Sequence, residues 1–186
     1  LNMLNTKWII MPAEGGGTLP IANPYYQGNA WFVDTIMFVN NADEEIDALG
    51  KIDLHNQAVA DKQFASLLDG FSVTPKDSAS SIWLESYDSN FLDYRIDAKK
   101  DELAVFSEIY YPKGWQITID EKPATMLRAN YTLRALPIPE GKHEIVFKFD
   151  PPSIKITDTI AYIALALMLL TAIVTVWKEI KAGLRS

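Results

Sequence analysis

The chain has 186 residues, of which 48% are hydrophobic and 22% charged, with a formal net charge of -7 and no cysteine. This length fits one domain of ordinary size with a small addition, and the lack of cysteine excludes a disulfide scaffold, a zinc ribbon and a cysteine nucleophile. The acidic balance argues against nucleic acid as a partner, and two histidines leave little room for a histidine-rich metal site. We therefore expect no metal and no cofactor.

The N-terminal residues predict a strand, a loop and a second strand. Residues 3–11 are rich in β-branched and aromatic side chains, which favour a strand. Glycine and proline recur from Pro12 to Pro24, so we predict a flexible loop there. The triple glycine at 15–17 lacks the lysine that ends a phosphate-binding loop. Residues 29–39 predict one long strand.

The segment NNADEEIDALGK predicts a short helix. Asn41 can cap its N-terminus, and Glu44 is spaced to complete a capping box. Gly50 follows the last turn and predicts the end of the helix. The acidic side chains lack the spacing of a calcium loop, so helix capping explains them better. The side chains predicted to share the apolar face are those of Ala42, Ile46 and Leu49.

From residue 58 onward, short strands alternate with turns. The predicted strands are 58–61, 71–73, 81–87, 90–98, 103–111, 115–120, 124–128, 130–136 and 143–149. Several alternate between apolar and polar side chains, as in Leu92, Tyr94 and Ile96, which is typical of half-buried antiparallel sheets. We place His143 at a strand start as a hydrogen-bonding residue. The pattern predicts a mainly β protein, an antiparallel β-sandwich of jelly-roll or immunoglobulin-like kind with one short helix.

The C-terminal segment predicts a single transmembrane helix. Residues 160–177 are eighteen residues without a charge, about 27 Å of helix against a bilayer core of about 30 Å. Lys178, Lys181 and Arg185 follow with only Glu179 against them, so the C-terminus is expected to be cytoplasmic. The predicted division is an extracytoplasmic β-sandwich over residues 1–156, a transmembrane helix over 157–178 and a basic tail over 179–186. Residues 1–158 are thus expected outside, and a core helix of a soluble protein is the alternative.

The start of the chain bears on how this domain reaches the outside. The sequence opens LNMLNTKWII, with neither an initiator methionine nor an export signal. A domain outside the membrane needs an earlier segment to translocate it. We therefore expect a membrane core upstream of Leu1, with removal of a leader as the alternative.

The most specific motifs lie in residues 108–153, EIYYPKGWQITIDEKPATMLRANYTLRALPIPEGKHEIVFKFDPPS. They resemble the C-terminal extracytoplasmic domain of YfhO-like bacterial membrane proteins. The matching positions are Tyr110, Tyr111, Pro112, Gly114, Trp115, Asp120, Lys122, Arg128, Asn130, Arg134, Ala135, Gly141, Lys142, His143, Phe147, Phe149, Pro151 and Pro152. LNTKWII, Asn23–Pro24 and GNAWFV are also similar to that family. Glu121 replaces the hairpin glycine of the family, which disfavours a type I′ turn there.

This resemblance implies a plasma-membrane protein with a GT-C-like core that moves sugar from a lipid-phosphate carrier to an envelope polymer. It places the catalytic carboxylate in an early extracytoplasmic loop that is missing from this sequence, so no catalytic residue is assigned. This segment would then be non-catalytic, with the bilayer, the upstream membrane core and an envelope glycan or lipid-linked sugar as partners. The alternative is a membrane-tethered carbohydrate- or protein-binding scaffold without transferase activity. An independent carbohydrate-active enzyme is disfavoured because no acid and base pair is placed by the sequence.

Two clusters are candidate ligand-binding residues. Tyr110, Tyr111 and Trp115 are candidates for stacking on a sugar, against the alternative that they are buried aromatic side chains of the sandwich. The second cluster consists of Arg128, Asn130 and Arg134. These residues share one face if residues 126–136 stay extended, and two guanidinium groups can hold a phosphate or an acidic polymer. The alternative is a solvated face paired with nearby carboxylates.

Overall fold

The computed structural model describes residues 1–183, which form two compact units. The first runs from Leu1 to Phe149 and the second begins at Asp150. Arg185, which contributes to the predicted basic tail, lies outside the described residues.

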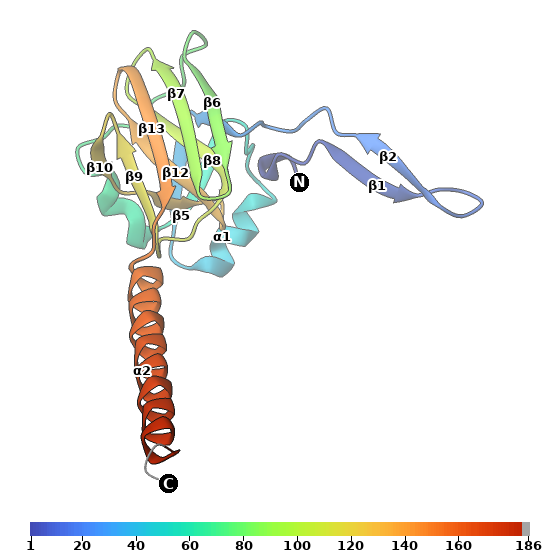
Figure 1. Ribbon diagram of the computed structural model, residues 1–186. Coiled ribbons are helices and arrows are strands. Elements are labelled where there is room, and N and C mark those ends of the chain that lie inside the picture. Colours follow the sequence, from blue (N-terminus) through green and yellow to red (C-terminus); the bar gives the residue numbers. More distant parts are fainter. Residues whose placement is uncertain (184–186) are drawn as a thin grey trace. The chain divides into compact units, whose positions relative to one another are not determined.

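Two antiparallel sheets of the first unit form the predicted sandwich (Figure 1). The outer sheet has the order β10-β9-β13-β7-β6, with the bounds β10 Lys122–Ala124, β9 Trp115–Ile119, β13 Gly141–Phe149, β7 Phe91–Ala98 and β6 Ser81–Asp88. The central sheet has the order β11-β12-β8-β3, with the bounds β11 Leu127–Ala129, β12 Leu133–Ile138, β8 Glu102–Ile109 and β3 Ala30–Val33. The mainly β, antiparallel fold predicted from the alternation is confirmed.

The core of the sandwich comes from the alternating apolar side chains. Leu92, Tyr94 and Ile96 of β7 are buried against residues of the central sheet, as the period-two pattern predicts. The rings of Tyr94, Phe106 and Phe147 pack edge to face in all three pairings, with centroids 5.0–5.9 Å apart. These contacts fix the spacing between the two sheets.

A third layer covers the other face of the central sheet. It contains β4 (Thr35–Val39), α1 (Ala42–Leu49), β5 (Gln57–Asp61) and the 3-10 helix η2 (Lys62–Leu68). Strands β4 and β5 pair in parallel, joined by α1. Because β8 lies between two layers, Leu103 and Val105 are buried toward this layer while Ala104 and Phe106 face the sandwich core. The sequence did not predict this parallel layer.

Two strand predictions in this region are wrong. Residues 29–39 form β3 and β4 in different sheets, and the break falls at Asp34. The Asp34 amide donates to the Asn56 carbonyl oxygen at 2.6 Å and its carboxylate accepts the Lys76 amide at 2.7 Å, which turns the chain. Residues 71–73 are not a strand, although Phe71 and Val73 pack on the core of the third layer.

Helix α1 begins as predicted but buries a different face. The Asn41 side chain accepts the Glu44 amide at 2.9 Å, which confirms the N-cap, and the Glu44 carboxylate accepts the Asn40 amide at 2.9 Å. The buried side chains are those of Glu45 and Ala48, whereas Ile46 is exposed. The prediction was therefore wrong for Ile46, whereas Ala42 and Leu49 of the predicted face are half-buried. The helix is turned so that Glu45 contacts Arg128.

Tight hairpins replace several predicted loops and strands. Thr18–Ala22 forms a strand, β2, paired with β1 (Trp8–Pro12), where a flexible loop was expected. Asp120 and Glu121 both have positive φ between β9 and β10, so the type I′ turn that Glu121 was expected to disfavour is present. Asn130 and Tyr131 have positive φ as well, and the stretch 126–136 therefore folds back as β11 and β12. A short 3-10 helix, η1 (Asn2–Leu4), precedes β1.

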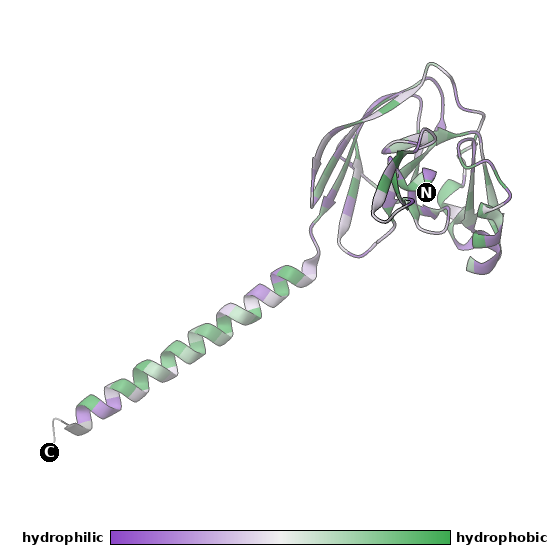
Figure 2. Cartoon of the chain, turned by 90° about the vertical axis from the view of Figure 1, so that its right-hand side faces the viewer, coloured by the Kyte–Doolittle hydropathy of each residue, from purple (hydrophilic) through white to green (hydrophobic). Residues whose placement is uncertain are grey.

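The second unit is one long helix, α2 (Pro152–Gly183), uniformly apolar over its middle (Figure 2). The helix begins at Pro152, ahead of the predicted transmembrane helix over 157–178. The stretch Pro152–Lys181 is long and apolar enough to cross a membrane. The hydroxyl groups of Thr171 and Thr175 donate to helix carbonyl oxygens three and four residues earlier, so they are satisfied without water.

Candidate ligand-binding face

Trp115 and Arg134, two of the predicted ligand-binding residues, contact each other within the protein. The Arg134 guanidinium carbon lies 4.3 Å from the Trp115 ring centroid, and Phe149 packs against the same indole at 5.3 Å between centroids. Arg134 is buried, and its Nε donates to the Ile109 carbonyl oxygen at 2.9 Å. Burial lowers the pKa of Arg134. Much of the Trp115 ring is thus occupied by protein groups.

Arg128 and Asn130 tie the central sheet to the third layer. Arg128 Nη2 lies 2.7 Å from a carboxylate oxygen of the buried Glu45, and the Tyr131 amide donates to the other oxygen at 2.7 Å. Asn130 is fully buried, and its Oδ1 accepts the Val59 amide at 3.0 Å. The cross-strand pairing of Arg128 with Arg134 does put both on one face, but they hold different internal partners.

Tyr110 and Tyr111 differ in their surroundings, as expected for adjacent residues at a strand end. Tyr110 packs edge to face on Phe64 at 5.7 Å, and burial raises the pKa of its phenol. Tyr111 is about half exposed. The six predicted residues are therefore not gathered at one opening, and ligand binding by them stays a prediction.

The outer face of the outer sheet presents an aromatic and charged row that the sequence analysis missed. Trp83 of β6 pairs with Arg95 of β7, which pairs with Glu144 of β13. Residues directly opposite on antiparallel strands share a face, and the exposed Trp83 indole lies on the solvent side, since its neighbours Ile82 and Leu84 pack on the core. We call Trp83, Arg95 and Glu144 the Trp83 row. The alternation of SIWLES was the signal that could have identified it.

Ion pairs order the charged end of this row. Arg95 contacts Glu144 at 2.8 Å and Asp93 at 3.1 Å. Next to Glu144, the Asp120 carboxylate accepts the Glu144 amide at 2.9 Å and lies 2.6 Å from His143 Nδ1. The hydrogen-bonding role expected for His143 is thus confirmed. These contacts hold the long side chains in place before any ligand arrives.

A shallow cavity of about 420 Å³ lies over the row. Its polar lining includes Arg95, Asp97, Asp120, Lys142 and Glu144, beside Trp83. An exposed indole offers an apolar plane, while carboxylate and cationic groups around it can hydrogen-bond hydroxyl groups. This combination suits a polar ligand that has an apolar face, such as a sugar ring.

The Asp120 carboxylate of the cavity is poorly suited to acid catalysis at neutral pH. Partial burial would raise the pKa of Asp120, but the hydrogen bonds from His143 and the Glu144 amide outweigh it and lower that pKa. A carboxyl group with a lowered pKa holds no proton to donate near pH 7. In the described part of the chain, no group of three or more histidine, aspartate or glutamate side chains is placed to hold a metal ion.

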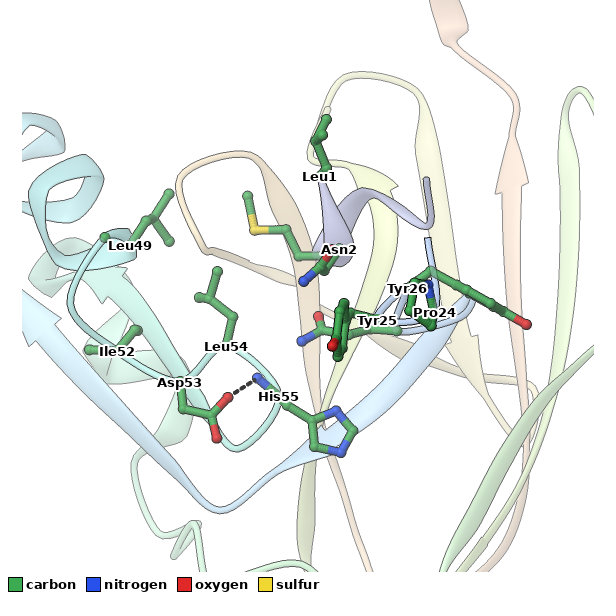
Figure 3. A pocket seen from close by; sticks show the side chains of 13 residues that line it. Leu1, Asn2, Pro24, Tyr25, Tyr26, Leu49, Ile52, Asp53, Leu54 and His55 are labelled. Atoms are coloured by element: carbon green, nitrogen blue, oxygen red, sulfur yellow. Dashed lines mark hydrogen bonds between the residues drawn. The ribbon is translucent and has the colours of Figure 1, made fainter. Parts of the chain in front are cut away.

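A second hollow of about 950 Å³ lies between the N-terminal residues and the loop that follows α1 (Figure 3). Leu49, Ile52 and Leu54 line one side, and Tyr25 and Tyr26 the other. The Asp53 carboxylate of this hollow is used locally, since it accepts the His55 amide at 3.0 Å and the Asn56 side-chain amide at 2.6 Å, whereas the buried Gln27 Oε1 has no hydrogen-bond partner among the described residues. The Trp83 row combines an exposed indole with several charged side chains and is the stronger candidate for a sugar ligand.

Comparison with known proteins agrees with the predicted resemblance. Residues 73–161 match the family described as "Bacterial membrane protein YfhO". The chain is 24% identical to the "Uncharacterized protein YfhO" of Bacillus subtilis (strain 168) over 118 aligned residues. The aligned region covers 63% of this chain and 13% of that protein. No solved structure matches the chain significantly. The chain is thus similar to YfhO proteins over residues 73–161 and spans a small part of its relative's length.

Proposed function

We propose that this YfhO-like chain is a non-catalytic, membrane-anchored β-sandwich that binds a cell-envelope glycan on its outer sheet. The observation that carries the proposal is the Trp83 row, an exposed indole beside paired charged side chains over a shallow cavity. Glycan sites combine an aromatic plane with a few placed polar groups. The pairing of Arg95 with Glu144 orders these groups in advance, which lowers the entropy cost of binding.

The role proposed for the whole protein follows from the resemblance to YfhO. Such a protein would transfer sugar from a lipid-phosphate carrier to an envelope glycan or polymer on the outer face of the plasma membrane. The sandwich would hold the acceptor near the transferase core, whose catalytic residues lie outside this sequence. The lowered pKa of Asp120 fits a binding role better than an acid role.

A second candidate is a scaffold module without transferase activity. It is favoured by the ion pairs of the Trp83 row, in which Arg95 already contacts Glu144 and one carboxylate oxygen of Asp93. Charges that are satisfied internally can serve to stabilise the sheet alone. A scaffold of this kind would bind no glycan at the row.

A binding screen separates the two candidates. The chain in detergent micelles is titrated with neutral and anionic envelope glycans, and Trp83→Ala is compared with Tyr87→Ala. Tyr87 is an exposed aromatic residue of the same strand that does not line the cavity. We expect Trp83→Ala to lose at least about tenfold in affinity, about 1.4 kcal/mol, and Tyr87→Ala to bind normally. Binding lost only in Trp115→Ala would move the site to Trp115, and no binding by the unaltered chain would favour the scaffold.

A further inference from the structure

The hairpin formed by β1 and β2, which we call the arm (residues 8–22), exposes most of its large apolar side chains. In Figure 1 it extends away from the sheets of its own unit. Trp8 is 63% exposed, Ile10 70% and Leu19 55%, and each strand packs mainly on the other strand. A two-stranded hairpin is marginally stable alone in water. An exposed apolar hairpin of this size indicates a binding surface.

The two faces of the arm differ in chemistry. Residues that are opposite in the ladder share a face, so the register divides the arm into two sets. One face is wholly aliphatic and consists of Ile9, Met11, Leu19 and Ile21. The other face is mixed and consists of Trp8, Ile10, Pro12, Thr18, Pro20 and Ala22. The arm is thus a sheet with one aliphatic side and one side of aromatic, proline and hydroxyl groups.

The edges of the arm are unsuited to strand addition. The Ala13 amide donates to the Gly17 carbonyl oxygen, and the Asn23 amide donates to the Lys7 carbonyl oxygen. These bonds show which opposite residue pairs of the arm are hydrogen-bonded pairs and which are not. By the alternation of antiparallel pairs, Pro12 and Pro20 then occupy the positions whose amide nitrogens point outward. Proline has no N–H to donate there and blunts an edge. The partner is therefore recognised through side chains, which disfavours a paired strand of a second copy.

Polar and aromatic groups bracket the aliphatic side chains. At the base, Lys7 lies 5.5 Å from the Tyr26 ring centroid, and Tyr25 is 74% exposed. Aromatic residues and lysine favour the headgroup level of a bilayer. Between Trp8 and Ala22, Glu14 in the glycine-rich tip is the only charged residue. A sheet that lies flat can keep both ends of the arm at headgroup level while its middle contacts acyl chains.

We propose that the arm lies in the interface of the bilayer, with Ile9, Met11, Leu19 and Ile21 toward the acyl chains and Trp8 toward the headgroups. The bilayer is the apolar phase to which this chain is tethered, because α2 is able to span it. Interfacial elements are expected to bury an apolar face about 5–10 Å deep, which matches a single layer of side chains. The arm would then be a second membrane contact besides α2, independent of glycan binding.

The absence of cysteine from the chain allows a direct test. Single variants Leu19→Cys and Tyr87→Cys carry an environment-sensitive fluorophore, and the whole chain is reconstituted in phosphatidylcholine vesicles at less than one chain per vesicle. Tyr87 is the matched control, an exposed hairpin residue of the outer sheet. We expect the label at residue 19 to shift to shorter wavelength and to lose fluorescence to spin-labelled lipids, and the label at 87 to do neither.

Two results would overturn the proposal. One is a label at residue 19 that stays as exposed to water as the label at 87. The other is a label at residue 19 that becomes shielded from water only when several chains share a vesicle, and that spin-labelled lipids do not quench. That result would show that the arm contacts a second copy of the chain. A further variant combines Leu19→Asn and Ile21→Asn with Met11→Cys, which carries the fluorophore. Its label should lose the lipid quenching seen with Met11→Cys alone if the aliphatic face holds the arm.

Discussion

Glu45 is the residue whose environment departs furthest from expectation, because it is charged, helical and fully buried. Its two carboxylate oxygens are taken by Arg128 and by the Tyr131 amide. Removing one partner of a buried pair leaves the other without compensation, which costs far more than the pair itself contributes. The helix position is thus set by a polar contact, and apolar periodicity alone could not predict it.

Substitution of Glu45 tests this contact. We expect Glu45→Ala to lower the free energy of unfolding by about 3 kcal/mol, because Arg128 and an amide lose their acceptors. Asp47→Ala, on the exposed face of the same helix, should change it by less than about 0.5 kcal/mol. Urea denaturation of the chain in micelles measures both variants. Equal losses would show that Glu45 has no special role.

Asp120 makes the stability of the sandwich depend on pH. Burial alone would raise its folded-state pKa, but the hydrogen bonds from His143 and the Glu144 amide outweigh burial, and the pKa is lowered. A carboxyl group of this kind stabilises the fold above its unfolded pKa of about 3.9, and that stabilisation is lost as the pH falls through the folded value. We therefore expect the unaltered chain to lose more stability than Asp120→Asn on acidification from about pH 6 to about pH 3. Denaturation curves that shift in parallel would contradict this assignment.

At the scale of elements, two turns form where the residue types give little sign of them. Asp120–Glu121 and Asn130–Tyr131 adopt positive φ without a glycine. Glutamate and tyrosine are disfavoured there, so these turns are held by the strands that they join. β9 also pairs with β13 and β12 also pairs with β8, so the rest of each sheet holds the second strand of the hairpin and the turn adopts the conformation that the pairing requires.

This origin of the β9–β10 turn predicts the effect of restoring a glycine. Glu121→Gly should raise the free energy of unfolding by about 0.5 kcal/mol, because the left-handed backbone no longer carries a Cβ penalty. Glu121→Val should lower it, since a β-branched residue resists φ of +66°. Thermal denaturation of the two variants is the measurement. A loss of stability with glycine would mean that the Glu121 side chain itself stabilises the turn.

At the scale of the whole molecule, the side of the membrane that carries the sandwich has the largest consequence for function. Lys178 and Lys181 follow the apolar span, and the positive-inside tendency then predicts an extracytoplasmic sandwich. In intact cells that express the natural full-length protein, a membrane-impermeant maleimide should label Tyr87→Cys directly and Lys181→Cys only after permeabilisation. The reverse pattern would place the sandwich in the cytoplasm and remove envelope glycans as ligands.

Features that depend on local periodicity could be predicted from the amino-acid sequence alone. Alternating side chains predicted β7, β8 and β13, and an uncharged stretch predicted α2, because one strand or helix suffices to display its own pattern. The tertiary structure decided which strands and helices are neighbours. The pairing of Glu45 with Arg128 joins residues 83 apart, and the Trp83 row exists only in the register of three strands. Such contacts arise from packing and strand register, which no single segment contains.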